Sequence, residues 1–200
     1  MLKRFCSLLS CLLIASSLRA QNPPSAERGA VAIWVGGGFS TFNPDYGCSS
    51  ASPFTCGSGQ IQGITTFGDV NHLLFPRLGA EAQGRFLHWG GPSGMSEDSY
   101  LFGPRFTLLH YRRRLKVDGK FLIGDGHINL PNHAPGEGNY FVYAPGMDAD
   151  FRLSPRWAAR VGYEYQVWPS FEGVPTPFTS GTGGITPNGF SFGVSYAILR

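Results

Sequence analysis

The feature that most constrains the fold is an alternation of apolar and polar residues with a period of two, repeated about eight times along the chain. Residues 78–88 show it most clearly, because Glu81, Gln83 and Arg85 alternate there with apolar or small residues. Successive side chains of a β-strand point to opposite faces, so each such segment predicts a strand with one apolar and one polar face. The predicted strands are 29–42, 61–70, 78–88, 99–110, 115–126, 139–153, 156–168 and 189–199, of which the first two alternate least regularly.

The connections between these segments alternate in length. Short turns fall at 71–77, 112–114 and 154–155, whereas long polar loops rich in glycine and proline fall at 43–60, 89–98, 127–138 and 169–188. In an antiparallel arrangement every short turn then lies at one end of the strands and every long loop at the other, as in outer-membrane barrels. The chain also holds 28 glycines, which helices tolerate poorly. The predicted fold is all-β, an eight-stranded antiparallel up-and-down transmembrane β-barrel.

The first residues have the composition of a secretory signal peptide. Lys3 and Arg4 give a basic start, residues 8–14 form an apolar stretch, and Ala15, Ser16, Ser17 and Ala20 are small. The predicted division is therefore a Sec-type signal peptide over 1–20, a short N-terminal segment over 21–28 and a barrel over 29–200. Removal of Lys3, Arg4 and Arg19 from the 16 basic residues leaves 13, against 13 acidic residues. This neutral balance gives no indication of a nucleic-acid partner.

Two cysteines, Cys48 and Cys56, remain after the signal peptide, in a stretch rich in serine, glycine and proline. Oxidising compartments favour disulfides in exported proteins, so we expect a local Cys48–Cys56 bridge within the first long loop. A metal site would need more ligands than this stretch contains.

Alternation alone does not show which of the two faces points into the barrel. A soluble secreted barrel that binds a small apolar ligand would place its aromatic face inside, whereas a membrane barrel would place its charged face in the lumen. Buried charges are tolerated when they are paired, and the near balance of the polar face favours the lumen over a solvated surface. The predicted interior charge network consists of Glu81, Arg85, Arg105, Lys116, Asp118, Lys120, Asp148, Asp150, Arg152, Arg160 and Glu164.

Two other residue types bear on the barrel. Aromatic residues near the predicted strand ends are typical of the two interfacial girdles of a membrane barrel. They are Tyr100, Tyr140, Tyr143, Trp157, Tyr165 and Tyr196. Pro104 and Pro145 fall within predicted strands, and because proline cannot donate to a ladder, each predicts a β-bulge.

Several stretches of the chain resemble a known family. They are LGAEAQGRFLHWGG (78–91), YLFGPRFTL (100–108), GKFLIGDGHINLP (119–131), RWAARVGYEYQVWPSF (156–171) and TPNGFSFGVSYAI (186–198). They are similar to strands of the small outer-membrane β-barrel proteins of the OmpA-type transmembrane class, in standalone form without a periplasmic domain. The resemblance implies an outer-membrane location, a monomer, and contact with outer-membrane lipid and the barrel assembly machinery. The chain departs from the family at its end, where Leu199 and Arg200 follow the alternating strand instead of a terminal aromatic residue.

Groupings that would support catalysis are scarce. A lipid-modifying barrel enzyme would need a serine, a histidine and an orienting acid together on its lipid-facing surface. Ser191 and Ser195 have lumen parity, whereas His88 and His110 have the opposite parity, so the sequence predicts no triad and no enzyme. His127 and His133 share one loop and are interpreted as surface histidines, so no metal or cofactor is expected.

The predicted interior is narrow. An eight-stranded barrel has a lumen that side chains can fill, so a lumen crossed by paired charges is a packed core that would admit very small solutes at most. Function then belongs to the long loops, since binding residues are often carried on loops of a rigid scaffold. The sequence predicts an outer-membrane protein with a structural or surface-interaction role, which binds an extracellular ligand or surface through its loops and forms no open pore.

Overall fold

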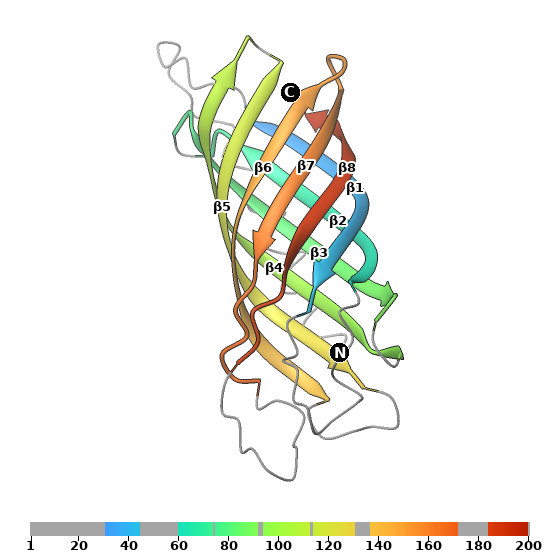
Figure 1. Cartoon of the computed structure of the whole chain (residues 1–200). Helices are drawn as coiled ribbons and strands as arrows, with labels where there is room; N and C mark the ends of the chain where they lie inside the picture. The colour runs from blue at the N-terminus through green and yellow to red at the C-terminus, as the bar shows by residue number, and fades with distance from the viewer. Residues whose placement is uncertain are drawn as a thin grey trace, which may run out of the picture.

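The computed structural model describes residues 31–44, 60–73, 75–91, 94–112, 114–130, 137–171 and 184–199. Their strands form one closed antiparallel barrel in which neighbours in sequence pair with each other and β8 closes onto β1 (Figure 1). The strands are β1 (Ala32–Asn43), β2 (Ile61–Asn71), β3 (Leu78–Trp89), β4 (Ser96–Tyr111), β5 (Leu115–Asn129), β6 (Gly138–Arg152), β7 (Trp157–Tyr165) and β8 (Asn188–Leu199). The predicted fold class is confirmed.

The two ends of the barrel differ as the connection lengths predict. In Figure 1 the short turns after β2, β4 and β6 lie at the top, and the strand ends joined by longer connections lie at the bottom. We call these the short-turn end and the loop end. Observed strand limits differ from the predicted ones by at most three residues, as at the starts of β1 and β4 and the ends of β5 and β7. No helix in the described part of the chain is long and apolar enough to cross a membrane.

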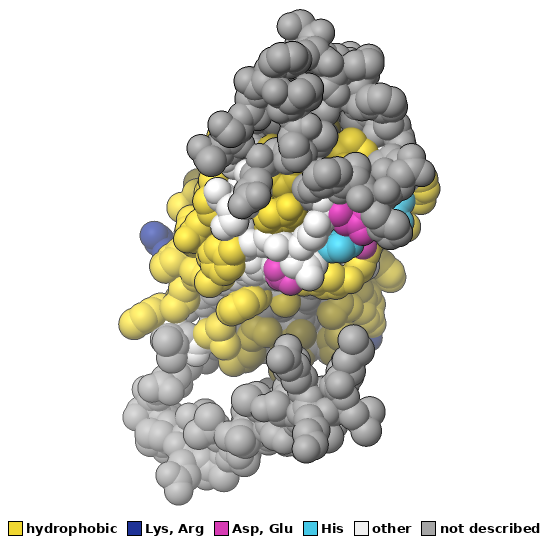
Figure 2. All heavy atoms as spheres, turned by 90° about the horizontal axis from the view of Figure 1, so that it is seen from below, with side chains coloured by type: hydrophobic (Ala, Val, Ile, Leu, Met, Phe, Trp, Pro, Cys, Tyr) yellow, Lys and Arg dark blue, Asp and Glu magenta, His cyan; other side chains and the backbone are white. Residues whose placement is uncertain are grey.

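The exposure of the two strand faces shows which of them lines the interior of the barrel. Large apolar side chains point outward, and Phe102 and Phe192 expose 63% and 49% of their surface. Figure 2 shows these hydrophobic side chains over the visible flanks of the molecule. Charged side chains point inward, where Arg85 and Arg105 are each 1% exposed. The lumen is therefore lined by the charged face of the strands and not by the aromatic face.

The predicted bulges at Pro104 and Pro145 are wrong. The β4–β5 ladder skips Gly103 and Pro104 and resumes at Arg105 in the same register, and the β5–β6 register runs unbroken through Pro145. On its other side Pro145 lies just beyond the β6–β7 ladder, which begins at Gly146. A missing N–H group removes one ladder hydrogen bond, and these strands accommodate that loss without an inserted residue.

The register shifts of the barrel lie elsewhere. They occur at Ile33/Trp34 between β1 and β8, at Gln62/Gly63 between β2 and β3, and at Thr107/Leu109 between β4 and β5. Beyond the last shift, side chains of β4 point to the opposite face from the one that simple alternation predicts. The reason is that an extra residue in one strand puts the alternation one position out of step. After this shift His110 pairs with Lys116 and lines the interior at the short-turn end. The outward parity predicted for His110 is therefore wrong.

Gly38 in β1 lies directly against the backbone of the neighbouring strand β8. A Cβ atom at this position would overlap the carbonyl oxygen of Phe192. We expect Gly38→Ala to lower the free energy of unfolding by about 1–3 kcal/mol, because backbone must move to relieve the overlap. The control is Gly68→Ala, where the nearest atom would be 3.9 Å from the added Cβ. Urea unfolding of both refolded variants, followed by tryptophan fluorescence, checks this, and equal losses would contradict it.

Candidate functional site

The interior of the barrel is the candidate functional site, and it has three layers along the axis. A cavity occupies the short-turn end, a network of charged side chains fills the middle, and an apolar cluster closes the loop end. Each layer is built by inward-facing positions of several strands, so each one depends on closure of the barrel.

The middle layer, here called the lumen charge network, contains five cationic and six carboxylate side chains. They are contributed by consecutive strands from β2 to β7. The members are Asp69, Glu81, Arg85, Arg105, Lys116, Asp118, Lys120, Asp148, Asp150, Arg160 and Glu164. Most of them are almost fully buried, so their charges are stabilised mainly by one another.

Arg105 on β4 is the hub of the lumen charge network. Its Nη1 lies 2.9 Å from Asp69 Oδ2, and its Nη2 lies 2.8 Å from both Asp118 Oδ2 and Asp150 Oδ2. Glu81 and Asp148 each approach the same guanidinium to 3.6 Å. One planar cation thus joins five carboxylates from four other strands of the barrel wall, which suits arginine better than lysine.

Arg160 and Lys120 complete the centre of the network. Arg160 Nε donates to Asp150 Oδ1 at 2.6 Å, and its Nη2 donates to Asp69 Oδ2 at 2.7 Å. Its guanidinium also lies over the ring of Phe67, 4.0 Å from the centroid. Lys120 Nζ donates to Glu81 Oε1 at 3.0 Å. Carboxylates of β2, β3 and β6 are therefore held to cations of β5 and β7 across the lumen.

A second set of contacts connects the network to the loop end. Arg85 Nη1 donates to Glu164 Oε1 at 2.7 Å, and Gln166 Nε2 donates to the same oxygen at 2.8 Å. Gln166 Oε1 in turn accepts a hydrogen bond of 2.8 Å from Trp168 Nε1. A continuous polar chain thus runs from the charged middle layer to the indole at the loop end.

The sequence predicted ten of the eleven members of this network. Asp69 was missed because its segment, 61–70, alternates weakly, although it shares the parity of Ile61 and Thr65, which are also buried. Arg152 was placed in the interior, but it is exposed. It is the last residue of β6, so its side chain reaches the rim of the barrel, where it lines the short-turn cavity.

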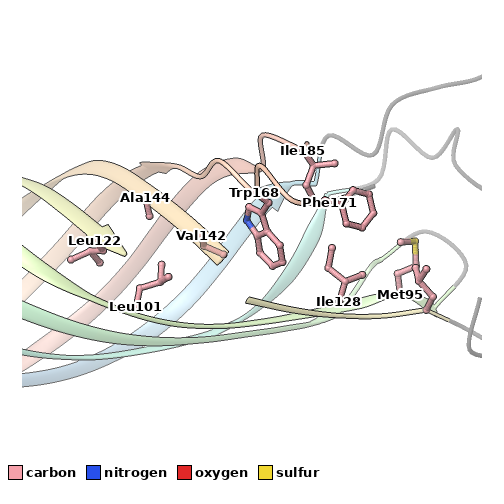
Figure 3. Close-up of a cluster of buried hydrophobic side chains, with 10 residues drawn as sticks. Met95, Leu101, Leu122, Ile128, Val142, Ala144, Trp168, Phe171 and Ile185 are labelled. Atoms are coloured by element: carbon pink, nitrogen blue, oxygen red, sulfur yellow. The ribbon is translucent and has the colours of Figure 1, made fainter. Parts of the chain in front are cut away.

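The loop-end cluster consists of buried apolar side chains inside the barrel mouth. Figure 3 shows Trp168, from the segment after β7, pointing into the interior toward side chains of β4, β5 and β6. Gly126 makes room for it, because a Cβ there would overlap the indole ring. The members are Met95, Leu101, Leu122, Ile128, Leu130, Val142, Ala144, Trp168, Phe171 and Ile185. The sequence carried a signal for this layer, since Leu101, Leu122 and Val142 share the parity of the charged residues on their strands.

The short-turn cavity has a volume of about 710 Å³. Histidine, arginine and lysine side chains from the turns after β2, β4 and β6 and the adjoining strand ends contribute most of its polar lining. The lining residues are Ala32, Trp34, Asp69, Asn71, His72, His110, Arg112, Arg114, Leu115, Lys116, Asp150, Arg152, Ala158 and Ser195. Its floor is the lumen charge network, because Asp69 and Asp150 belong to both.

Most of the predicted girdle residues lie on the outer surface. Trp157 packs edge-on against Tyr196 near the short-turn end, with ring centroids 5.0 Å apart, and Phe141 packs against Tyr143 nearer the loop end. Tyr140 is an exception to the prediction, because it packs against Trp168 and Phe171 of the loop-end cluster.

Of the residues considered for catalysis, His110 and Ser195 both line the short-turn cavity, whereas His88 lies apart from both serines. Ser191 and Ser195 are on β8, whereas His88 on β3 pairs with Asp98 at 2.7 Å, and β8 is adjacent to neither β3 nor β4. His127 Nδ1 is 2.9 Å from Asn139 Oδ1. Within the described residues no group of three or more histidine, cysteine or acidic side chains is arranged to hold a metal ion. His133, Cys48 and Cys56 lie outside the described residues.

Comparison with solved structures finds the same architecture. Neisserial surface protein A (NspA) superposes with a TM-score of 0.53 at 9% sequence identity, covering 83% of this chain and 96% of that one. The outer membrane protein OprG from Pseudomonas aeruginosa gives 0.54 at 11% identity, covering 86% and 97%. The fold is that of the small eight-stranded outer-membrane β-barrels. No protein-family model and no curated protein matches the sequence.

Proposed function

We propose that the chain is an outer-membrane protein, a monomeric barrel that acts structurally or in surface interactions through its loops. The observation that carries this proposal is the inverted polarity of the barrel. Charged side chains such as Arg105 and Asp118 are buried, whereas Phe102, Phe106 and Leu108 on the same strand wall are more than half exposed. In water such a wall would expose a large apolar surface to solvent, whereas in a membrane it lies against lipid chains, which are also apolar.

The lumen supports a barrel without an open pore. Ions entering from the loop end would meet the loop-end cluster, where Leu122, Ile128 and Val142 have no exposed surface. Those entering from the short-turn end would meet Arg105, which forms ion pairs with carboxylates on several strands. Two successive layers of side chains therefore oppose passage, one by low polarity and one by filled space.

The two ends suggest how the barrel is oriented. Short turns face the periplasm in barrels of this architecture, and long loops face outward. We propose that the signal peptide over 1–20 directs export and that the barrel assembly machinery inserts the chain into outer-membrane lipid. The loops then provide the surface for an extracellular partner, and a Cys48–Cys56 disulfide stiffens the first of them.

Membrane fractionation tests the location directly. The expected result is recovery with outer-membrane markers, and a shift in mobility between unheated and heated samples on an SDS gel. Closed barrels resist unfolding by the detergent until they are heated, so the shift reports a folded barrel. Recovery in the periplasmic fraction would contradict the proposal.

A charge placed on the outer wall provides a test of the lipid contact. Phe192 lies in the middle of β8, paired with Phe39 and Val161. We expect Phe192→Arg to lower the free energy of unfolding in lipid vesicles by about 2–4 kcal/mol, because the arginine would be exposed to hydrocarbon. The control is Phe75→Arg, at an exposed position in the turn after β2. A Phe192→Arg variant as stable as this control would count against a lipid-facing wall.

A further inference from the structure

The cationic side chains are distributed unevenly along the barrel axis. In the described part of the chain every lysine and arginine belongs either to the lumen charge network or to the short-turn end. Those at the short-turn end outside the network are Arg77, Arg112, Arg114, Arg152 and Arg156. The described residues of the loop end carry acidic side chains instead, among them Asp98, Asp125 and Glu137. The short-turn end is therefore the basic pole of the molecule.

The short-turn cavity concentrates this charge around one partly open space. Its two carboxylates, Asp69 and Asp150, are both held by Arg105 and Arg160 below them. Lys116 is likewise paired with Asp118 at 3.0 Å. The acids near the cavity are thus neutralised from within the network, and among the described residues none of them makes an ion pair with Arg112 or Arg114 of its rim.

Arg112 and Arg114 form that rim on the turn after β4. Neither of them makes an ion pair with a carboxylate of the described residues, and the Arg112 guanidinium lies 5.3 Å from the ring centroid of Tyr111. On the turn after β2, which lines the same cavity, the buried Nδ1 of His72 has no hydrogen-bond partner among the described residues. His110 lines the same space beside Lys116. The cavity therefore offers several hydrogen-bond donors without an internal acceptor.

We propose that the short-turn cavity binds a phosphate group. Guanidinium groups bind phosphate oxygens through paired, charge-assisted hydrogen bonds, and ammonium and imidazole groups add further donors. A cavity of about 710 Å³ is larger than a phosphate ion. Trp34, Leu115 and Ala158 give it an apolar side as well, which suits a phosphate carried on a small organic group.

Two sources can supply this phosphate, a phospholipid headgroup at the adjoining membrane surface or free phosphate in solution. The headgroup source follows from the proposed membrane location, whereas the site itself belongs to the folded barrel. The experiment therefore uses the full chain refolded in a sugar-headed detergent, which contains no phosphate. A loss of binding there is distinct from a failure of membrane localisation.

The test titrates the ¹⁵N-labelled barrel with inorganic phosphate in one arm and with dihexanoyl phosphatidylglycerol, below its micelle concentration, in the other. NMR shifts of cavity residues report binding. The double variant Arg112→Gln/Arg114→Gln is compared with Arg77→Gln/Arg156→Gln, which removes the same charge from exposed turn residues that do not line the cavity. Heat-dependent gel mobility confirms that both variants fold.

The expected result is saturable shifts confined to the cavity, with an affinity at least about tenfold lower in the cavity variant. The control pair should change the affinity by less than about twofold, because exposed charges are screened. Binding of inorganic phosphate would identify free phosphate as sufficient, and binding of the lipid alone would identify the headgroup. Absence of saturable shifts in both arms, or equal losses in the two variants, would overturn the proposal.

Discussion

Arg105→Met is expected to lower the free energy of unfolding by about 3–5 kcal/mol, enough to leave little folded barrel after refolding. The substitution keeps a side chain of similar length but removes the cation that Asp69, Asp118 and Asp150 share within 2.9 Å. The lumen charge network would then hold six carboxylates against four cations in a space with almost no solvent exposure. Buried carboxylates that lose their cationic partner destabilise the fold far more than replacement of the whole ion pair by apolar residues does.

Unfolding by urea in lipid vesicles, followed by tryptophan fluorescence and heat-dependent gel mobility, measures this loss. Arg105→Lys should give a smaller loss, because an ammonium restores the charge but cannot reach every carboxylate that the planar guanidinium contacts. The control is Arg77→Met, which removes an exposed arginine from the turn after β2 and should cost less than about 0.5 kcal/mol. If Arg105→Met were as stable as this control, the lumen charges would have to be solvated by water.

The strands and their polarity were predictable because both follow from local alternation. A period of two fixes which side chains share a face, and the balance of charge on one face favours the lumen. Partner choice was not predictable in the same way. Arg105 on β4 meets Asp69 on β2, and Arg85 on β3 meets Glu164 on β7, only because closure brings distant strands across one narrow interior.

One departure from the alternation had the largest consequence for the candidate site. The register shift at Thr107/Leu109 places the side chain of His110 at the wall of the short-turn cavity, and no residue type at the shift predicts it. Proline gave a misleading signal, because the β3–β4 and β5–β6 registers run unbroken through Pro104 and Pro145. Bulges of this kind are decided by how neighbouring strands fit together around the barrel, which a single strand does not encode.

The loop-end cluster shows a different limit. Its strand residues were readable from parity, since Leu122 and Val142 continue the inward faces of Lys120 and Asp148. Trp168 is harder to place, because it follows β7 in a segment that pairs only through isolated bridges, with Tyr143 at Val167 and with Ile185 at Trp168 itself. Its position depends on the space left by Gly126 and on the hydrogen bond to Gln166. The packing that closes the loop end therefore depends on contacts between different segments, and no single segment predicts it.

Trp168→Ala is expected to lower the free energy of unfolding by about 3–5 kcal/mol, because Trp168 is 1% exposed and its removal leaves a cavity in the loop-end cluster. It also removes the donor to Gln166 Oε1, at the end of the polar chain that leads to Glu164 and Arg85. The control is Trp89→Ala, since Trp89 is half exposed on β3, and it should cost much less.

The same Trp168→Ala variant separates the two layers that close the lumen. Urea unfolding should show the loss of stability, whereas single-channel recording in planar bilayers should show no steady conductance. The reason is that Arg105 and Lys120 still join β4 and β5 to the carboxylates of β2, β3 and β6 below the opened cluster. Steady conductance in Trp168→Ala would mean that the apolar cluster alone seals the barrel. A stability equal to that of Trp89→Ala would mean that the loop end adds little to the fold, and that the lumen charge network and the strand ladders hold the barrel closed.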